Sequence, residues 1–242
     1  MEPSSTHTVR SYDDELTRLN NIILQMGGLV ESQIAAAIDA MIQRDSAAAE
    51  KVMDQDRLID DLEHEVERLV TRLLALRQPM ATDLRLAIGA LKLASDLERM
   101  GDLARNIAKR TVALSQMREA PSLWVIPRMA ELVQAMVKGA LDAYVERDEA
   151  KAESVWRRDT EVDEVYNSLF RQLLTYMFED PRSITSCAHL MFVAKNLERI
   201  ADHATNMAET IVFLVSGRRV VAERPKADTT ATITNNGIGG RG

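Results

Sequence analysis

A short acidic segment occurs twice in the chain, one hundred residues apart. Residues 97–108 read LERMGDLARNIA and residues 197–208 read LERIADHATNMA. Each copy places a glutamate, an aspartate and an asparagine four residues apart: Glu98, Asp102 and Asn106, then Glu198, Asp202 and Asn206. On an α-helix this spacing puts the three side chains on one face. Two acids at i and i+4 repel and destabilise a helix by about a few tenths of a kcal/mol. Their repetition indicates a cation or a basic partner at that face.

A second acidic pair belongs to the same repeat. Residues 37–45 (AIDAMIQRD) return as residues 140–148 (ALDAYVERD), and at that offset Asp56 and Asp60 correspond to Asp159 and Asp163. Neighbouring helices of a bundle lie about 8–10 Å apart, so the pairs are expected to converge into one four-carboxylate cluster in each half. Magnesium, manganese and iron take such oxygen ligands. Asn106 and Asn206 could add amide oxygens at the next turn.

The alternative for each acidic pair is an ordinary solvated helix face. Four pairs at equivalent positions favour cation binding over that alternative. A further group of acids has no counterpart in the second half and is expected at the surface: Asp61, Glu63, Glu65 and Glu67.

Two arginines and one histidine accompany the acids. Arg99 and Arg199 follow the repeated glutamates. They could form salt bridges with Asp102 and Asp202, or pair with a carboxylate or phosphate of a partner; the sequence leaves both open. His203 adjoins Asp202, which makes it an additional candidate ligand, although the first copy has Leu103 at that position.

The composition predicts an all-α protein. Of 242 residues, 46% are hydrophobic but only 4% aromatic, a balance that favours helices over sheets. Apolar residues at three-four spacing predict six long helices. They cover about residues 12–44, 45–78, 82–117, a stretch after Pro121 and Pro127 to about 147, 149–177 and 183–215. The repeat groups them into two tandem three-helix bundles, residues 1–119 and 120–217, followed by a polar tail, 218–242, that is expected to be disordered.

Charge and motifs exclude several classes of protein. The net charge of −7 disfavours general binding of nucleic acid or anionic lipid. The single Cys187 fits a reducing cytosol, and neither a secretory signal nor a membrane-spanning run is evident. Walker, GxGxxG, GxSxG and HExxH motifs are missing, so we expect a protein that is not an enzyme.

Five strings in order resemble the PhoU family of phosphate-transport regulators. They are MGGLVE at 26–31, QPMATDLR at 78–85, DLERMGDLARNIA at 96–108, LLTYMFEDPRSI at 173–184 and NLERIADHATNMAE at 196–209. The resemblance runs from about Tyr12 to about Gly217. It implies two similar three-helix bundles whose E(D)-x-x-x-D motifs hold iron or other divalent clusters. The matching positions are Asp56, Asp60, Glu98, Asp102, Asp159, Asp163, Glu198 and Asp202. Ala201 in the second copy replaces Gly101 of the first.

The resemblance also implies a function. Family members are cytoplasmic, often homodimeric adaptors that link the ATPase of a phosphate ABC transporter to a phosphate-sensing histidine kinase and repress the phosphate-starvation regulon. Iron, zinc, manganese or magnesium would be the cofactor. The candidate partner contacts are Arg99, Arg199, Asn106, Asn206 and Arg85, the last residue of QPMATDLR. We expect no contact with nucleic acid and no insertion into the membrane.

Two other functions remain open. A ferritin-like di-metal protein or oxidase would also use clustered carboxylates, but the Glu-x-x-His pairs of such sites are missing from the expected helices. A purely structural helical spacer would bind no metal, and chelation would not change its stability.

Overall fold

The computed structural model describes residues 4–117 and 125–218, with side chains from Tyr12 onward. Every long element in these ranges is a helix. The elements are α1 (Ser4–Gln43), α2 (Ser46–Gln55), α3 (Arg57–Arg77), α4 (Thr82–Ser115), α5 (Val125–Glu146), α6 (Glu149–Glu179), the 3-10 turn η1 (Pro181–Ser183) and α7 (Ile184–Ser216). The predicted disordered tail lies outside the described residues except for Arg218.

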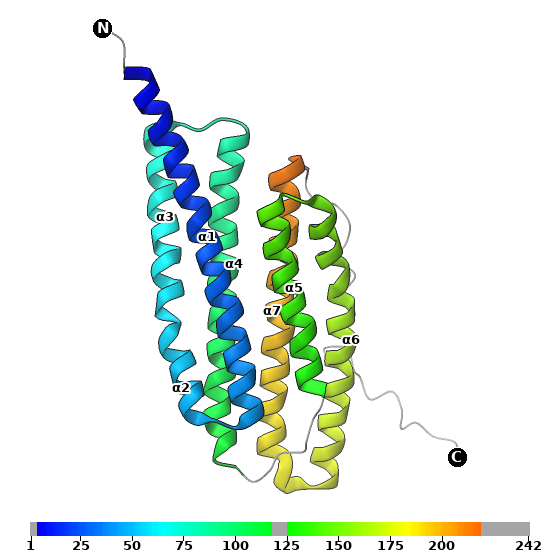
Figure 1. Ribbon diagram of the computed structural model, residues 1–242. Coiled ribbons are helices and arrows are strands. Elements are labelled where there is room, and N and C mark those ends of the chain that lie inside the picture. The colour runs from blue at the N-terminus through cyan, green and yellow to red at the C-terminus, as the bar shows by residue number, and fades with distance from the viewer. Residues whose placement is uncertain (1–3, 118–124, 219–242) are drawn as a thin grey trace.

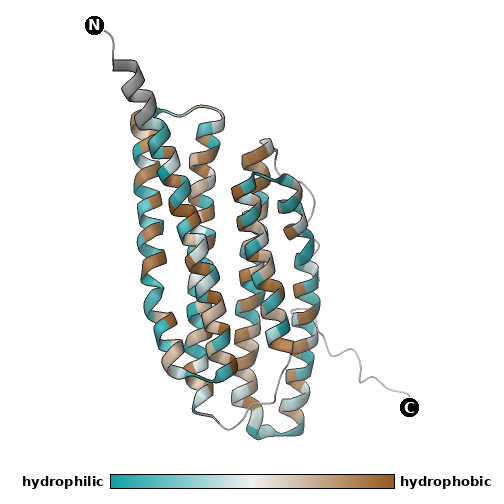
Figure 2. Ribbon diagram, viewed as in Figure 1, coloured by the Kyte–Doolittle hydropathy of each residue, from teal (hydrophilic) through white to brown (hydrophobic). Residues whose placement is uncertain are grey.

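The helices form two three-helix bundles side by side, which confirms the predicted fold class (Figure 1). In the first bundle, α1 and α4 run beside a rod made of α2 and α3; in the second, α5, α6 and α7 repeat the arrangement. Hydrophobic residues recur along each helix, interrupted by hydrophilic ones (Figure 2). They build a continuous core that includes Ile23, Leu97, Met136 and Leu197.

Three predicted helix ends differ from the structure. The chain is already helical at Ser4 rather than from about Tyr12. Pro127 lies in the first turn of α5 instead of before it, where a proline without an N–H is tolerated. The predicted second helix is divided at Asp56 into α2 and α3. There the Ile59 N–H donates a hydrogen bond to the Asp56 carbonyl three residues earlier (2.9 Å).

The repeat extends to the turns that begin the second helix of each half. Asp45 caps α2 by accepting a hydrogen bond from the Ala48 N–H (3.0 Å), and Asp148 caps α6 by accepting one from the Lys151 N–H (3.1 Å). The preceding residues, Arg44 and Arg147, have left-handed φ angles of 54° and 51°. The same local sequence therefore builds the same turn twice, as the repeat predicts.

The two halves pack against each other mainly through α4 and α7, with α1 against α5 beside them. A Cβ atom on Gly27 of α1 would lie 2.5 Å from Cδ2 of Leu141 on α5, and one on Gly89 of α4 would lie 2.3 Å from Cδ2 of Leu214 on α7. These glycines let the helices approach closely. The halves are therefore one packed unit rather than two bundles on a free linker.

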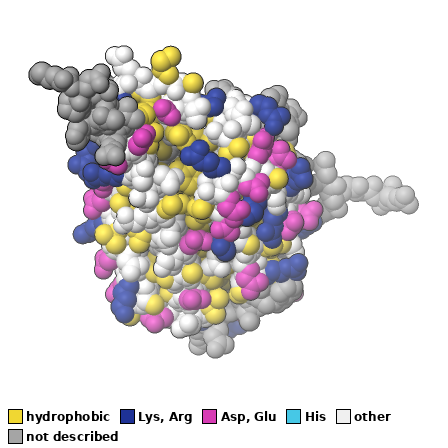
Figure 3. Space-filling view, turned by 45° about the horizontal axis from the view of Figure 1, so that its top comes forward, with side chains coloured by type: hydrophobic (Ala, Val, Ile, Leu, Met, Phe, Trp, Pro, Cys, Tyr) yellow, Lys and Arg dark blue, Asp and Glu magenta, His cyan; other side chains and the backbone are white. Residues whose placement is uncertain are grey.

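The surface carries charges of both signs. Acidic and basic side chains alternate with exposed hydrophobic ones on the face of Figure 3. Among residues 4–117 and 125–218, no helix combines the length and apolarity needed to cross a bilayer.

Adjacent glycines in α1 provide a matched test of the contact between the halves. Gly28 has no atom within 4 Å of a built Cβ, so Gly28→Ala should raise the free energy of unfolding by about 0.5–1 kcal/mol through helix propensity. Gly27→Ala must displace Leu141 and should be less stable than Gly28→Ala by about 1–3 kcal/mol. Urea denaturation of both variants measures the difference. Equal gains for the two would contradict the close α1–α5 contact.

Candidate metal-binding faces

The acidic face of the first half is formed by Asp56 at the α2–α3 break, Asp60 on α3, and Glu98 and Asp102 on α4. Asp56 is only 3% exposed, whereas the other three are half-buried. Gln33 on α1 donates from Nε2 to Asp56 Oδ1 (3.0 Å), and Nε of Arg105 lies 3.6 Å from Asp56 Oδ2.

The carboxylates of this face act on one another. Burial raises the pKa of Glu98 to about 6, and repulsion from Asp102, Glu63 and Asp60 adds to the effect. Burial also raises the pKa of Asp56, reinforced by Asp60 and Asp102. Acids of α3 and α4 therefore share one side of the bundle. Glu63, which was predicted to lie at the surface, is instead half-buried. Its charge is one of those that raise the pKa of Glu98.

The second half encloses its carboxylates more fully. Asp159 and Asp163 on α6 are 3% and 4% exposed, and Glu198 on α7 is 6% exposed, while Asp202 is half-buried. Burial raises the pKa of Glu198, and the charges of Asp202 and Asp163 raise it further. Asp163, Glu198 and Asp202 therefore act on one another, and Asp159 lies one helical turn before Asp163.

Different residues balance the charge in the two halves. Thr205, which stands at the position of Arg105, donates to Asp159 Oδ1 (3.3 Å). Lys195, which stands at the position of Ser95, places Nζ 2.9 Å from Glu198 Oε2. Because Glu198 Oε2 is buried, this ion pair lies away from solvent. No repeated residue signals Gln33, Arg105, Thr205 or Lys195, and the sequence analysis missed all four.

The candidate partner contacts lie in different places. Arg99 is exposed and bridges Glu98 (3.5 Å) and Asp102 (3.8 Å), so its salt-bridge role is present in the free protein. Arg199 and Asn106 are exposed, and Asn206 is half-buried. Arg85 lies about 25 Å along α4 from Asp102, at 1.5 Å per residue, beside Gly217 at the end of α7. It is therefore not part of an acidic face.

His203 has a structural partner rather than a place among the carboxylates. Its Nδ1 lies 2.9 Å from Oδ1 of Asp96, so the pair joins α7 of one half to α4 of the other. The sequence suggested a ligand because His203 adjoins Asp202. On a helix, adjacent residues point in different directions, and His203 points across the interface.

The donor set fits cations that take oxygen ligands. Both faces present carboxylates without histidine or cysteine, the chemistry that magnesium, manganese and iron accept. In the first half, Gln33 Oε1 is buried without a hydrogen-bond donor and lies, like Asp56 Oδ1, beside Gly101. In the described ranges, however, no three His, Cys, Asp or Glu side chains already stand at the spacing of a metal centre. The acids share two faces without a preassembled ligand set.

Comparisons with known proteins place this architecture in a family. The PhoU domain model matches residues 23–111 and 126–211. The chain belongs to the PhoU family. A homologue from Caulobacter vibrioides (strain NA1000 / CB15N), named "phosphate-specific transport system accessory protein PhoU homolog", is 52% identical over 92% of this chain and 97% of its own length. A homologue of the same name from Rhizobium meliloti is 46% identical over 95% of this chain and 98% of its own length.

Solved PhoU structures have the same fold. PhoU from Pseudomonas aeruginosa superposes with a TM-score of 0.83 at 41% identity, covering 86% of this chain and 100% of that one. The phosphate transport system regulatory protein PhoU from Streptococcus pneumoniae gives 0.80 at 31% identity, covering 86% and 99%. The two PhoU-domain matches coincide with the two bundles, each with one acidic face.

The raised pKa of Glu98 predicts a pH-dependent stability difference. Since the folded value of about 6 lies above the ordinary 4.5, ionised Glu98 destabilises the metal-free fold. Its contribution to the free energy of unfolding is most favourable below pH 4.5 and is lost as pH rises through 6. Glu98→Gln should therefore be more stable relative to wild type at pH 7.5 than at pH 4.5.

Urea denaturation in chelator at both pH values measures this difference. Asp61→Asn, an exposed change on α3, serves as the control and should show a much smaller pH effect. A stability difference between Glu98→Gln and wild type that does not change with pH would show that burial and neighbouring acids do not raise the pKa of Glu98.

Proposed function

We propose that this chain is a cytoplasmic, homodimeric regulator of phosphate uptake. It would link the ATPase of a phosphate ABC transporter to a phosphate-sensing histidine kinase, repress the phosphate-starvation regulon and maintain phosphate homeostasis, without catalysing a reaction itself. The observation that carries the proposal is the match along 97% of a relative named as an accessory protein of phosphate-specific transport. The adaptor role, the partners and the location extend that name by family resemblance.

The acidic faces give the adaptor a physical means of binding. Each face buries like charges that repel, which raises the pKa of Glu98 and Glu198 above their ordinary range. A divalent or ferric cation would relieve that repulsion and reverse the local charge, so that an acidic patch of a partner could dock. Asp56, Asp60, Glu98 and Asp102 would hold the ion in one half, and Asp159, Asp163, Glu198 and Asp202 in the other.

Side chains around the faces would contact the partner. Arg99 and Arg199 are exposed beside the glutamates, and Asn106 and Asn206 lie one turn beyond the aspartates. Arginine pairs bidentately with carboxylate and phosphate groups. Arg85, beside Gly217 at the end of α7, would contact a partner at a separate place.

Metal binding is tested with two adjacent acids of α6. Asp163 is buried among the candidate ligands, whereas Glu164 is exposed. Manganese or ferrous iron should raise the melting temperature of wild type, because a ligand that binds only the native state stabilises it. Asp163→Asn should lose much of that shift, and Glu164→Gln should keep it.

Elemental analysis of protein purified without chelator or histidine tag accompanies the melts. A melting temperature that neither metal nor chelator changes would favour the structural spacer. Turnover of oxygen by the iron-loaded protein would favour the ferritin-like alternative.

The adaptor role is tested by an Asp102→Ala, Asp202→Ala double variant. Its affinity for the transporter ATPase and for the cytoplasmic part of the kinase should fall by about tenfold or more if cations at the faces carry the contact. Biolayer interferometry with and without added manganese measures the loss. An Asp61→Ala, Glu164→Ala variant removes the same number of acids, both of them exposed and outside the candidate ligand sets, and should bind like wild type. Undiminished binding by the first variant would refute the docking mechanism.

A further inference from the structure

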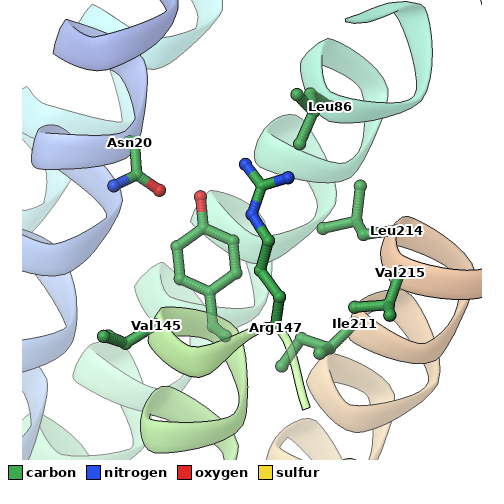
Figure 4. Close-up of a pocket in the computed structure, with 8 residues that line it drawn as sticks. Asn20, Leu86, Val145, Arg147, Ile211, Leu214 and Val215 are labelled. Atoms are coloured by element: carbon green, nitrogen blue, oxygen red, sulfur yellow. The ribbon is translucent and has the colours of Figure 1, made fainter. Parts of the chain in front are cut away.

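A cleft lies between the two halves, at the end of the molecule where α4 begins and α5 and α7 end. It has two adjoining lobes of about 110 and 310 Å³ that share Asn20, Leu86, Tyr144 and Arg147. The acidic faces do not contribute to either lobe. Leu86, Ile211, Leu214 and Val215 give one side an apolar wall, and the Arg147 side chain extends along it (Figure 4).

Comparison of the repeats singles out Arg147. Arg44 occupies the equivalent position in the first half, with the same left-handed backbone and the same capping aspartate behind it. The Arg44 guanidinium donates to the carbonyls of Leu114 and Met117 (2.7 Å to the latter), and so closes the end of α4. The equivalent position to Leu114 is Leu214, which lines the cleft beside Arg147.

Arg147 does not repeat that role. Among the described residues its guanidinium has neither a hydrogen bond nor an ion pair, and α7 ends instead with Gly217 donating its N–H to the Phe213 carbonyl (2.9 Å). In Figure 4 the Arg147 side chain extends away from the end of α5, and its guanidinium lies over α4 in this view. Arg44 thus bonds the last carbonyls of α4, whereas Arg147 does not bond the end of α7 and its guanidinium is available for a ligand.

Two uncharged polar residues, Tyr144 and Asn20, line both lobes of the cleft together with Arg147. Figure 4 shows the Asn20 amide on the α1 side of the cleft. Burial raises the pKa of Tyr144 to about 12, so its hydroxyl stays protonated and able to donate. Asp13 is the acidic residue on the wall of the larger lobe; it lies with Leu16 and Thr17 toward the start of α1 and disfavours a ligand of high negative charge.

We propose that this cleft binds the oxyanion group of a small ligand through Arg147. The planar guanidinium fork matches two oxygens of a phosphate or carboxylate, while Tyr144 and Asn20 donate further hydrogen bonds. The apolar wall accepts a carbon skeleton attached to the anion. This site is independent of the metal faces and of the adaptor role.

Isothermal titration with three probes tests the site: inorganic phosphate, phenyl phosphate and benzoate. Phenyl phosphate and benzoate have the ring that the apolar wall accepts, so at least one should bind saturably to wild type, and comparison with inorganic phosphate distinguishes a free anion from an anion on an apolar body. Arg147→Gln should weaken binding about tenfold or more, and Tyr144→Phe several-fold, as expected for lost charge-assisted and neutral hydrogen bonds. Arg128→Gln, which changes an exposed arginine near the start of α5 and away from the cleft, should bind like wild type.

Stability separates a binding role from a structural one. Arg44→Gln removes the contacts to Leu114 and Met117 and should lower the urea midpoint, whereas Arg147→Gln should leave it near that of wild type. The proposal is overturned if wild type binds none of the probes saturably, if Arg147→Gln binds equally well, or if Arg147→Gln unfolds as readily as Arg44→Gln.

Discussion

Carboxylates buried close to one another are the constraint on which the account of this PhoU-family chain depends. Asp56 in the first half, and Asp159, Asp163 and Glu198 in the second, are removed from water beside other acids. Desolvation and repulsion both oppose their ionised forms. Gln33, Arg105, Thr205 and Lys195 offset part of that cost. The raised pKa values of Asp56, Glu98 and Glu198 show that the offset is incomplete, and a bound cation would complete it.

The helices that carry these acids also hold the halves together. On α4, Glu98 faces the acids of α3, whereas Asp96 meets His203 across the interface. The Arg110 guanidinium lies 4.5 Å from the ring centre of Phe192, from α4 to α7. An acidic face and the inter-half contact therefore lie on the same rigid helix in each bundle. A cation bound at a face would therefore contact a helix that also packs against the other half.

The internal repeat made most of the fold predictable. The three-four spacing of apolar residues located the helices, and the repeat of residues 37–45 at 140–148 aligned Asp45 with Asp148, which cap α2 and α6. The eight acids could be assigned to two faces because both copies retain them. The residues that pair with these acids could not be predicted, because they are not repeated. Gln33 corresponds to Met136, and Arg105 corresponds to Thr205. Such partners depend on which helices pack together. The same is true of Arg44, which bonds the end of α4, and of Arg147, which makes no equivalent bond to α7. Periodicity within a helix does not contain that information.

Anomalous diffraction from crystals equilibrated with manganese tests the central claim most directly, because it locates the ions rather than inferring them. The account predicts anomalous peaks beside Asp60 and Glu98 in the first half and beside Asp163 and Glu198 in the second. Well-diffracting crystals in manganese with no peak at either face would contradict it.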